Sequence, residues 1–260
     1  MRILVVGAGG FVGGYLRSHF DRAGNEVVPV GRHTPLPADP VDVVVDCNGD
    51  ARRFWANENP ALSYCATVES TLSRLAALRA GRYVYLSSVD VYGAARGDRR
   101  ATREDQPILL DGLETYGLHK HQAEQAVRDR ATGPLVLRVG TLIGPGLRKN
   151  PVFDALHGDP IRQTPDSTLT LITLSKLAQA IDRLLAADAV GTFNVTASAS
   201  MTVAAMLGQV ARALGCPPGA FAFHDELLAT AYDISVEKMS RLMALPDSAA
   251  MLAEYLAGPR

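Results

Sequence analysis

The fold is decided by the stretch Ile3-Leu4-Val5-Val6-Gly7-Ala8-Gly9-Gly10-Phe11-Val12-Gly13 near the start of the chain. Its first four residues are apolar, and a run of this length is typical of a buried strand. Glycines at positions 7, 10 and 13 follow, as a tight turn between a strand and a helix requires. The run 11–20 then predicts a helix. The stretch therefore predicts a strand, a glycine turn and a helix in that order.

Strand-like apolar runs alternate with helical runs through the first half of the chain. We expect strands at 3–6, 26–30, 41–45, 83–86 and 135–139, and helices at 11–20, 60–78 and 113–130. Strands this uniformly apolar must be covered on both faces, which indicates a parallel sheet between layers of helices. The prediction is an α/β fold with a doubly wound parallel sheet, Rossmann-like in its arrangement.

The glycine turn has the chemistry of a dinucleotide-binding site. The backbone must approach a pyrophosphate closely there, and the N–H groups of the helix N-terminus face its charge. The expected contacts are Gly7, Gly10, Phe11, Val12 and Gly13. Gly10 and Phe11 would contribute backbone groups. A glycine-rich turn that binds no ligand is the alternative.

The end of the second strand predicts which dinucleotide binds. An acidic residue about 20 positions after the glycines would bind the ribose of NAD, but the sequence there is Val30-Gly31-Arg32-His33. Gly31 leaves room and Arg32 supplies a cation for a 2′-phosphate. NADP is therefore favoured over NAD, with a solvated surface arginine as the alternative for Arg32.

The second half of the chain has a different texture. Gly144-Pro145-Gly146 breaks the alternation, and helices are expected near 174–187, 202–214 and 235–256 with a strand at 192–195. We expect a dinucleotide-binding domain at 1–145 and a small C-terminal substrate-binding part at 146–260. The two would be partly interleaved, because 174–195 could still belong to the sheet.

Composition excludes several classes of protein. The chain has 260 residues, 47% of them hydrophobic and 20% charged, as in an ordinary globular protein. A net charge of -1 argues against a general binder of nucleic acid or acidic membranes. No run reaches the roughly 18 apolar residues of a membrane span. Three scattered cysteines predict neither a disulfide framework nor a metal site, and we expect free thiols in a reducing cytoplasm.

Two segments supply candidate catalytic groups. Tyr116 and Lys120 are four residues apart and share a helix face, where a cation beside a phenol lowers its pKa and allows proton transfer near neutral pH. Ser87-Ser88 follows the strand 83–86, and ligands sit at the carboxyl ends of strands in such sheets. A strand-to-loop cap is the alternative for the serine pair.

These motifs together resemble the extended short-chain dehydrogenase/reductase family, which includes nucleotide-sugar epimerases, dehydratases and 4-ketoreductases. The resemblance rests on Gly7-x-x-Gly10-x-x-Gly13, Ser87-Ser88-Val89-Asp90-Val91-Tyr92-Gly93 and Tyr116-x-x-x-Lys120. Glu104-Asp105-Gln106-Pro107, Ala123-Glu124, Leu137-Arg138-Val139-Gly140, Gly144-Pro145-Gly146 and Gly191-Thr192-Phe193-Asn194-Val195 follow the family's usual order. The resemblance covers roughly residues 1–215.

The resemblance implies a role for each catalytic residue. Tyr116 would be the general acid/base, Ser88 would hold the substrate oxygen, and Lys120 would bind the nicotinamide ribose and lower the pKa of Tyr116. The residues implied to line the cofactor are Cys47, Asn48, Ser87, Tyr116 and Lys120. The family also often dimerises through the helix that carries the tyrosine, so a homodimer is compatible with this sequence.

The chain departs from the family pattern at several positions. Asp46-Cys47-Asn48-Gly49 replaces His-Leu-Ala-Ala, and Thr67-Val68-Glu69-Ser70-Thr71 replaces Asn-Val-x-Gly-Thr. Only Asp90 remains of the acidic pair of the dehydratases, which makes dehydration the less favoured reaction. It could be a second acid/base or a loop residue with local hydrogen bonds.

Other polar residues have weaker signals. His119 and His121 flank Lys120 and are expected on the solvated surface of the helix. Arg52 and Arg53 could clamp a substrate phosphate or belong to an ordinary exposed loop. Lys149 and Asn150 are weaker candidates for the same role.

The leading hypothesis is an NADP-dependent oxidoreductase that reduces a ketone or aldehyde, with a 4-keto nucleotide sugar as one candidate. The expected partner is thus a small carbonyl or alcohol substrate. One alternative is a nucleotide-sugar epimerase that retains NAD(P). The other is a non-catalytic protein that senses NADP(H), which would not need Tyr116 and Lys120.

Overall fold

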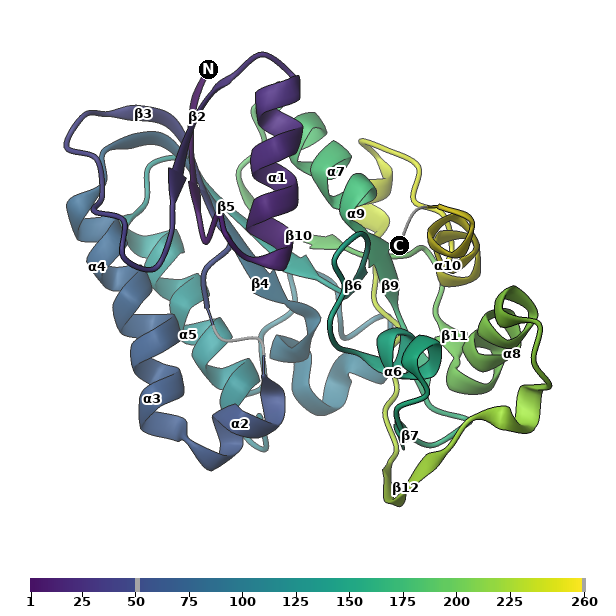
Figure 1. Cartoon of the computed structure of the whole chain (residues 1–260). Coiled ribbons are helices and arrows are strands. Elements are labelled where there is room, and N and C mark those ends of the chain that lie inside the picture. Colours follow the sequence, from purple (N-terminus) through teal and green to yellow (C-terminus); the bar gives the residue numbers. More distant parts are fainter. Residues whose placement is uncertain (50–51, 259–260) are drawn as a thin grey trace. The chain divides into compact units, whose positions relative to one another are not determined.

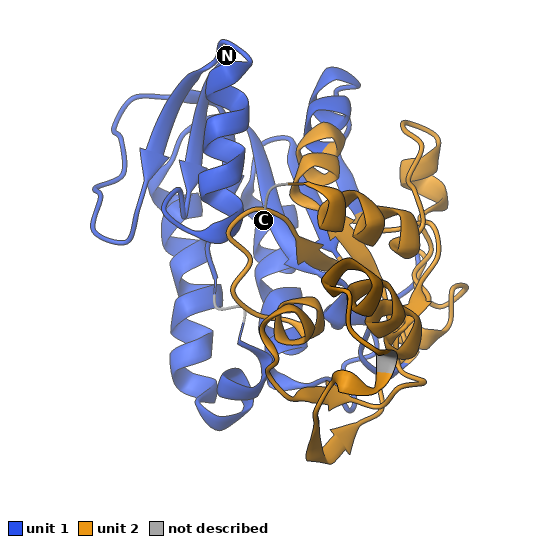
Figure 2. Ribbon diagram, turned by 45° about the vertical axis from the view of Figure 1, so that its right-hand side comes forward, with its two compact units in different colours: residues 1–94, 105–139, 181–193 blue, residues 95–104, 140–180, 194–260 orange. Residues whose placement is uncertain are grey.

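The structure is a computed structural model that describes residues 1–49 and 52–258, with the backbone only at Pro218. It divides into two compact units that each combine several stretches of the chain (Figure 2). Unit 1 comprises residues 1–94, 105–139 and 181–193, and unit 2 comprises 95–104, 140–180 and 194–260. The division into contiguous domains at residue 145 stays a prediction, because these units are defined by contacts and are discontinuous.

Unit 1 alternates strands and helices along the chain (Figure 1). Its elements are β1 (Arg2–Val6), α1 (Phe11–Arg22), β2 (Glu26–Val30), β3 (Val41–Asp46), α2 (Arg53–Glu58), α3 (Pro60–Tyr64), the π-helix η1 (Cys65–Glu69), α4 (Ser70–Ala77), β4 (Ala80–Ser88), α5 (Thr115–Arg130) and β5 (Pro134–Val139). Three further elements cross from one unit into the other: the 3-10 segment η2 (Val89–Gly97), α7 (Leu174–Ala186) and β10 (Gly191–Val195).

The sheet has six strands in the order β10-β5-β4-β3-β1-β2. The pairs β1–β2, β1–β3, β3–β4 and β4–β5 are parallel, so the expected doubly wound parallel sheet is confirmed. Strand order reverses between β1 and β3. Because crossovers are right-handed, this reversal puts α1 on one face and α4 and α5 on the other (Figure 1).

Apolar side chains from both faces of this sheet are buried. One core cluster includes Leu4, Val44, Tyr85, Val127 and Val136, from three adjacent strands, β5 and α5. The pattern explains why the strands read as continuous apolar runs. Helices cover the sheet on both faces, so the side chains of each strand are buried on both sides.

Unit 2 has a core of its own. Its elements are β6 (Thr141–Ile143), α6 (Pro151–His157), β7 (Ile161–Gln163), β8 (Thr168–Leu169), β9 (Leu171–Thr173), β11 (Met201–Thr202), α8 (Val203–Leu214), η3 (Pro218–Ala220), β12 (Phe223–Leu228), α9 (Glu237–Ser240) and α10 (Ser248–Ala257). The strands form three two-stranded sheets, β6–β9, β7–β12 and β8–β11. Helix α8 packs against α6 and α10, and α10 packs on β9.

Candidate active site

The glycine turn joins β1 to α1 at the edge where strand order reverses. Gly7 has φ 77°, a left-handed conformation that favours glycine, and its carbonyl accepts a hydrogen bond from Gly10 N–H at 2.8 Å. A Cβ placed on Gly13 would lie 2.2 Å from the Gly7 oxygen, so α1 can only approach β1 this closely with glycine there. A Cβ on Gly9 would meet no atom within 4 Å. The turn is thus open on the side where a phosphate would approach, and it fits a dinucleotide.

The end of β3 lies beside this turn. Cys47 N–H donates to the Val6 carbonyl at 3.1 Å, and a Cβ on Gly7 would lie 3.4 Å from the backbone of Cys47. Asn48 N–H donates to Asp46 Oδ1 at 3.0 Å, which turns the chain directly after the strand. Burial raises the pKa of the Cys47 thiol, and the Asp46 carboxylate raises it further, so the thiol is neutral. The segment expected to line the cofactor therefore borders the glycine turn.

Arg32 follows β2 and is exposed. The turn that carries it is closed by Gly31 N–H, which donates to Thr34 Oγ1 at 3.1 Å, and by Thr34 N–H, which donates to the Gly31 carbonyl at 3.3 Å. The carbonyl of Val30, the last residue of β2, accepts from Gly7 and Ala8 N–H at 2.8 and 3.2 Å. The end of β2 is thus bonded to the glycine turn, two residues before Arg32.

The two serines at the end of β4 have different partners. Ser87 is buried, and its hydroxyl donates to Glu124 Oε1 on α5 at 2.6 Å. Ser88 Oγ donates to Asp90 Oδ2 at 3.2 Å and accepts from Asp90 N–H at 3.1 Å. Ser88 therefore shares its hydroxyl with a carboxylate two residues on, the local hydrogen bonding that was one of the two interpretations of Asp90.

Tyr116 and Lys120 lie in the first two turns of α5. Lys120 is buried, and its Nζ donates to the Leu86 carbonyl at 3.0 Å and to the Tyr85 hydroxyl at 3.4 Å. Burial raises the pKa of Tyr85 well above its usual value, and the Asp46 and Tyr116 side chains raise it further. The side chains of Tyr116 and Lys120 are thus both near Tyr85, at the carboxyl end of β4.

Gly117 is a site residue that the sequence analysis did not single out. A Cβ placed there would lie 2.6 Å from the carbonyl oxygen of Asp90 and 3.4 Å from Leu113. This glycine lets α5 approach the segment after Ser88 directly beside Tyr116. A glycine inside a helix lowers helix stability by about 1 kcal/mol relative to alanine. A glycine directly after Tyr116 in a predicted helix was therefore the sequence signal for a close approach there.

Glu124 and Arg138 hold α5 against the sheet. Arg138 Nη2 on β5 lies 2.8 Å from Glu124 Oε2, and Arg138 Nη1 donates to the Tyr92 hydroxyl at 3.0 Å. Burial alone would raise the pKa of Glu124, but Arg138, the nearby His121 and the hydrogen bond from Ser87 lower it to about 2. The carboxylate is therefore charged and joins α5 to both strands that flank the site.

The prediction for the two histidines beside Lys120 was wrong, because both are buried. His119 Nδ1 is 2.9 Å from Ser63 Oγ, and its ring makes an edge contact with Tyr64. Burial lowers the pKa of His119. Helix α3 packs against α5 and covers His119, whereas His121 lies near Gln125 and Glu124 of α5 itself.

Arg53 lies at the start of α2, a short helix where an exposed loop was one of the two expectations. Its guanidinium makes a bidentate contact with Glu114, with Nη2 at 2.7 and 2.9 Å from the two carboxylate oxygens. Its Nη1 is also 3.7 Å from Asp90 Oδ1. Arg52 lies over the ring of Trp55, 4.1 Å from its centroid. Arg53 thus connects Glu114, the residue before α5, to Asp90, which bonds Ser88.

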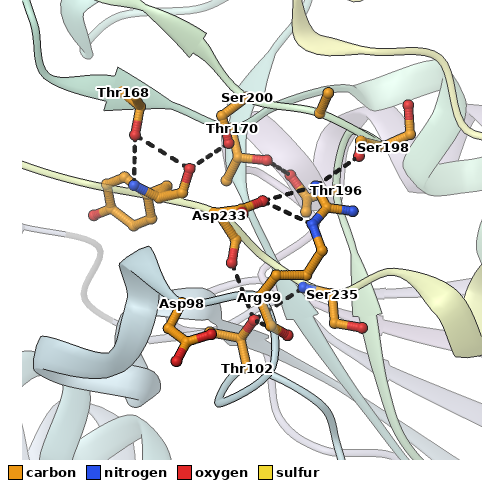
Figure 3. Close-up of polar contacts among 12 residues, drawn as sticks. Asp98, Arg99, Thr102, Thr168, Thr170, Thr196, Ser198, Ser200, Asp233 and Ser235 are labelled. Atoms are coloured by element: carbon orange, nitrogen blue, oxygen red, sulfur yellow. Dashed lines mark hydrogen bonds and ion pairs between the residues drawn. The ribbon is translucent and has the colours of Figure 1, made fainter.

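A polar network inside unit 2 anchors the chain that continues from η2 (Figure 3). Arg99 Nε donates to Asp233 Oδ1 at 2.9 Å, and Arg99 Nη2 donates to the Ser198 carbonyl at 3.0 Å. Thr102 Oγ1 donates to the Asp233 carbonyl at 3.1 Å and accepts from Ser235 N–H at 2.9 Å. These hydrogen bonds hold residues 99–102 against residues 198, 233 and 235.

Asn150, a weaker candidate for phosphate binding, caps α6. Its Oδ1 accepts from the backbone N–H groups of Val152 and Phe153, both at 3.0 Å.

Within the described ranges 1–49 and 52–258, no group of three or more His, Cys, Asp or Glu could hold a metal ion. None of the helices in those same ranges is long and apolar enough to cross a membrane.

Comparison with known proteins gives both a family and a fold. Residues 3–196 match the family described as "NAD dependent epimerase/dehydratase family". No curated protein matches the sequence. Among solved structures, MoeE5 in complex with UDP-glucose and NAD has 21% identity and a TM-score of 0.80 over 98% of this chain and 97% of that one.

Two further structures are similar. One is dTDP-4-dehydrorhamnose reductase from Bacillus anthracis str. Ames in complex with NADP, with 17% identity and a TM-score of 0.79 over 98% and 96% of the two chains. The other is RMD from Pseudomonas aeruginosa complexed with NADPH, with 18% identity and a TM-score of 0.78 over 98% and 99%. At these identities the likeness shows the fold.

Proposed function

The chain belongs to the NAD-dependent epimerase/dehydratase family, the extended short-chain dehydrogenases/reductases that its motifs resemble, and we propose that it is an NADP-dependent reductase of a ketone or aldehyde. The proposed substrate class is a 4-keto nucleotide sugar. Similar folds occur in a dTDP-4-dehydrorhamnose reductase bound to NADP and in a protein bound to NADPH.

One observation carries the proposal: Gly117 allows the helix of Tyr116 and Lys120 to lie directly against the segment that follows Ser88. In this arrangement Ser88 and Tyr116 would bind the substrate oxygen. They come from β4 and α5, which the hydrogen bond from Ser87 to the buried Glu124 joins, and such fixed donors favour catalysis because they need little reorganisation.

The glycine turn and the Cys47-Asn48 segment would hold the dinucleotide, with Arg32 at its 2′-phosphate. The nicotinamide, when bound, supplies the hydride that goes to the carbonyl carbon. Tyr116 would give its phenolic proton to the carbonyl oxygen, which converts the carbonyl to an alcohol. Lys120 would bind the nicotinamide ribose and favour the phenolate that remains.

Asp90 supports the reductase over a dehydratase. Its carboxylate bonds Ser88 and lies 3.7 Å from Arg53, and Val89 stands beside it where a second acid would be needed. A ketone or aldehyde oxygen only accepts hydrogen bonds, so Ser88 would turn its hydroxyl proton from Asp90 to the substrate oxygen.

The first test is a titration of the protein with NADPH and with NADH, followed by nicotinamide fluorescence. For Arg32→Ala we expect NADPH affinity to fall about tenfold or more, because a hydrogen bond to a charged group contributes about 1.5–3 kcal/mol. NADH affinity should be unchanged. Arg17→Ala, which removes an exposed arginine from α1, is the matched control.

Each other outcome has a definite meaning. Equal binding of NADPH and NADH would remove Arg32 from the site and favour an epimerase that retains NAD. Binding of neither would contradict the cofactor assignment. NADPH binding without release of NADP+ on any carbonyl substrate, unaffected by Tyr116→Phe, would indicate a sensor.

A further inference from the structure

A buried carboxylate lies at the end of β3, where the family pattern has histidine. Asp46 is fully buried. Its Oδ2 accepts from Arg74 Nε on α4 at 2.9 Å and from the Tyr83 hydroxyl on β4 at 2.6 Å. Its Oδ1 accepts from Asn48 N–H. All of these partners donate to the carboxylate, which has no contact with solvent.

The turn that begins at Asp46 lies beside the ammonium of Lys120. In the sheet, the Cα of Asp46 pairs with that of Tyr85, whose hydroxyl accepts from Lys120 Nζ and whose ring lies 5.0 Å from it. Three residues after Asp46, a Cβ placed on Gly49 would lie 3.1 Å from the same Nζ. Gly49 has φ 136°, so the turn that begins at Asp46 both requires glycine and leaves room for the ammonium.

Charged and titratable groups face Lys120 from every element around it. They are Asp46 and Cys47 at the end of β3, Arg74 on α4, Tyr85 on β4, and Tyr116 and Glu124 on α5. Burial lowers the pKa of Lys120 to about 8, Asp46 opposes this effect, and Arg74 adds to it. Burial also lowers the pKa of Arg74, but Asp46 raises it above its usual value, so both cations depend on one carboxylate.

We propose that Asp46 is a positioning residue for Lys120: its buried charge compensates the ammonium, and its hydrogen bond to Asn48 shapes the turn on which the ammonium rests. Without this charge, Arg74 and Lys120 would be two cations in a region of low dielectric constant, where repulsion is strong. Lys120 would lose its proton near neutral pH and with it the charge that the proposed function requires. The effect on cofactor binding rests on the proposed function, whereas the contacts of Asp46 and Lys120 do not depend on it.

The chain offers a direct measurement, because it has only four lysines, at 120, 149, 176 and 238. Protein labelled with 13C at lysine Cε would give four signals, and single Lys→Arg variants at 149, 176 and 238 would assign the one from Lys120 by elimination. In the native protein this signal should titrate near pH 8. No cofactor or substrate is needed.

Asp46→Asn keeps the oxygen that accepts from Asn48 and removes the charge. We expect the midpoint of Lys120 to fall by about one pH unit or more, a tenfold change in proton affinity. Tyr83→Phe removes a neutral hydrogen bond from the same carboxylate and is the matched control, with a much smaller shift expected. Arg74→Gln removes the neighbouring cation and should raise the titration midpoint of Lys120. This variant tests the proposal even if Asp46→Asn does not fold.

An unchanged midpoint in Asp46→Asn would overturn the proposal, as would an equal shift in Tyr83→Phe or a lower midpoint in Arg74→Gln. The pH dependence of NADPH binding separates this inference from the proposed function. If the Lys120 midpoint falls in Asp46→Asn and the upper limit of NADPH binding falls with it, both stand. If the midpoint falls but NADPH binding does not follow, Asp46 still positions Lys120, and the cofactor role of Lys120 is wrong.

Discussion

At the scale of single residues, neighbouring glycines in α1 have opposite requirements. A Cβ on Gly13 would lie 2.2 Å from the Gly7 carbonyl oxygen, far inside any normal contact. A Cβ on Gly14 would lie 3.5 Å from the Ala8 oxygen, an ordinary van der Waals distance. Only the first glycine is required by the approach of α1 to β1.

The pair gives a prediction about stability. Gly13→Ala should lower the free energy of unfolding by about 1–3 kcal/mol, because the backbone must shift to admit the methyl group. Gly14→Ala should leave it unchanged or raise it by up to about 1 kcal/mol, since alanine favours helix. Urea unfolding of the two variants measures both values. Equal effects of the two substitutions would contradict the role assigned to Gly13.

Residue spacing identified Tyr116 and Lys120, but it did not identify the groups around them. Asp46, Gly117 and the Glu124–Arg138 pair come from other elements and reach the site only through the packing of β3, β4 and α5. Their roles depend on distances between segments far apart in the sequence. One sequence carries no direct signal of such distances.

At the scale of elements, the expected run 60–78 is a helix with an irregular middle. The structure has α3, the π-helix η1 and α4 in place of one continuous helix. Thr67 lies in the π segment, buried, with its carbonyl accepting from the Thr71 hydroxyl at 2.7 Å. Apolar spacing over this run could not reveal the extra residue, because a single π-helical turn changes the period by only about one residue in one place.

Helix α6 gives an element-scale prediction about pH. Burial, and after it the nearby Asp159, raise the pKa of Asp154 to about 6. The folded state therefore binds this proton more tightly than the unfolded chain, so its contribution to stability is present below about pH 4 and is lost as pH rises to about 6. Asp154→Asn should remove that loss and be more stable than the native protein above pH 6.

Urea unfolding of both proteins between about pH 4 and 7 checks this prediction. Asp225→Asn changes the same charge on an exposed residue of β12 and controls for net charge. The advantage of Asp154→Asn should grow between pH 4 and 6 and then level off. A difference that does not vary with pH would contradict the raised pKa.

At the scale of the whole molecule, the chain builds two compact units from interleaved stretches. The chain leaves the sheet unit after Ala94, forms the Arg99–Asp233 network of unit 2, and returns at Asp105. A break near residue 145 was visible as Gly144-Pro145-Gly146, but this excursion was not. It depends on hydrogen bonds between segments more than 100 positions apart.

Glu124 gives a prediction for acid unfolding. Its pKa is lowered to about 2 in the folded protein, so it contributes stability above its ordinary pKa of 4.5, and this is lost as pH falls toward 2. Glu124→Gln at pH 7 should cost about 3–5 kcal/mol, because Arg138 is left charged and buried. The cost should shrink as the pH of urea unfolding is lowered from 7 to about 3. Glu124→Gln with Arg138→Met should cost less than Glu124→Gln alone, and an equal or larger cost would contradict the pairing.

The sequence by itself determined the doubly wound sheet, the glycine turn and the family, because apolar periodicity and glycine spacing are local properties. Tertiary packing alone buries His119 and His121, pairs Ser87 with Glu124 and Ser88 with Asp90, and brings the turn after Asp46 beside Lys120. Burial and hydrogen-bond partners arise where separate elements pack together. A pattern along one segment cannot specify what covers it.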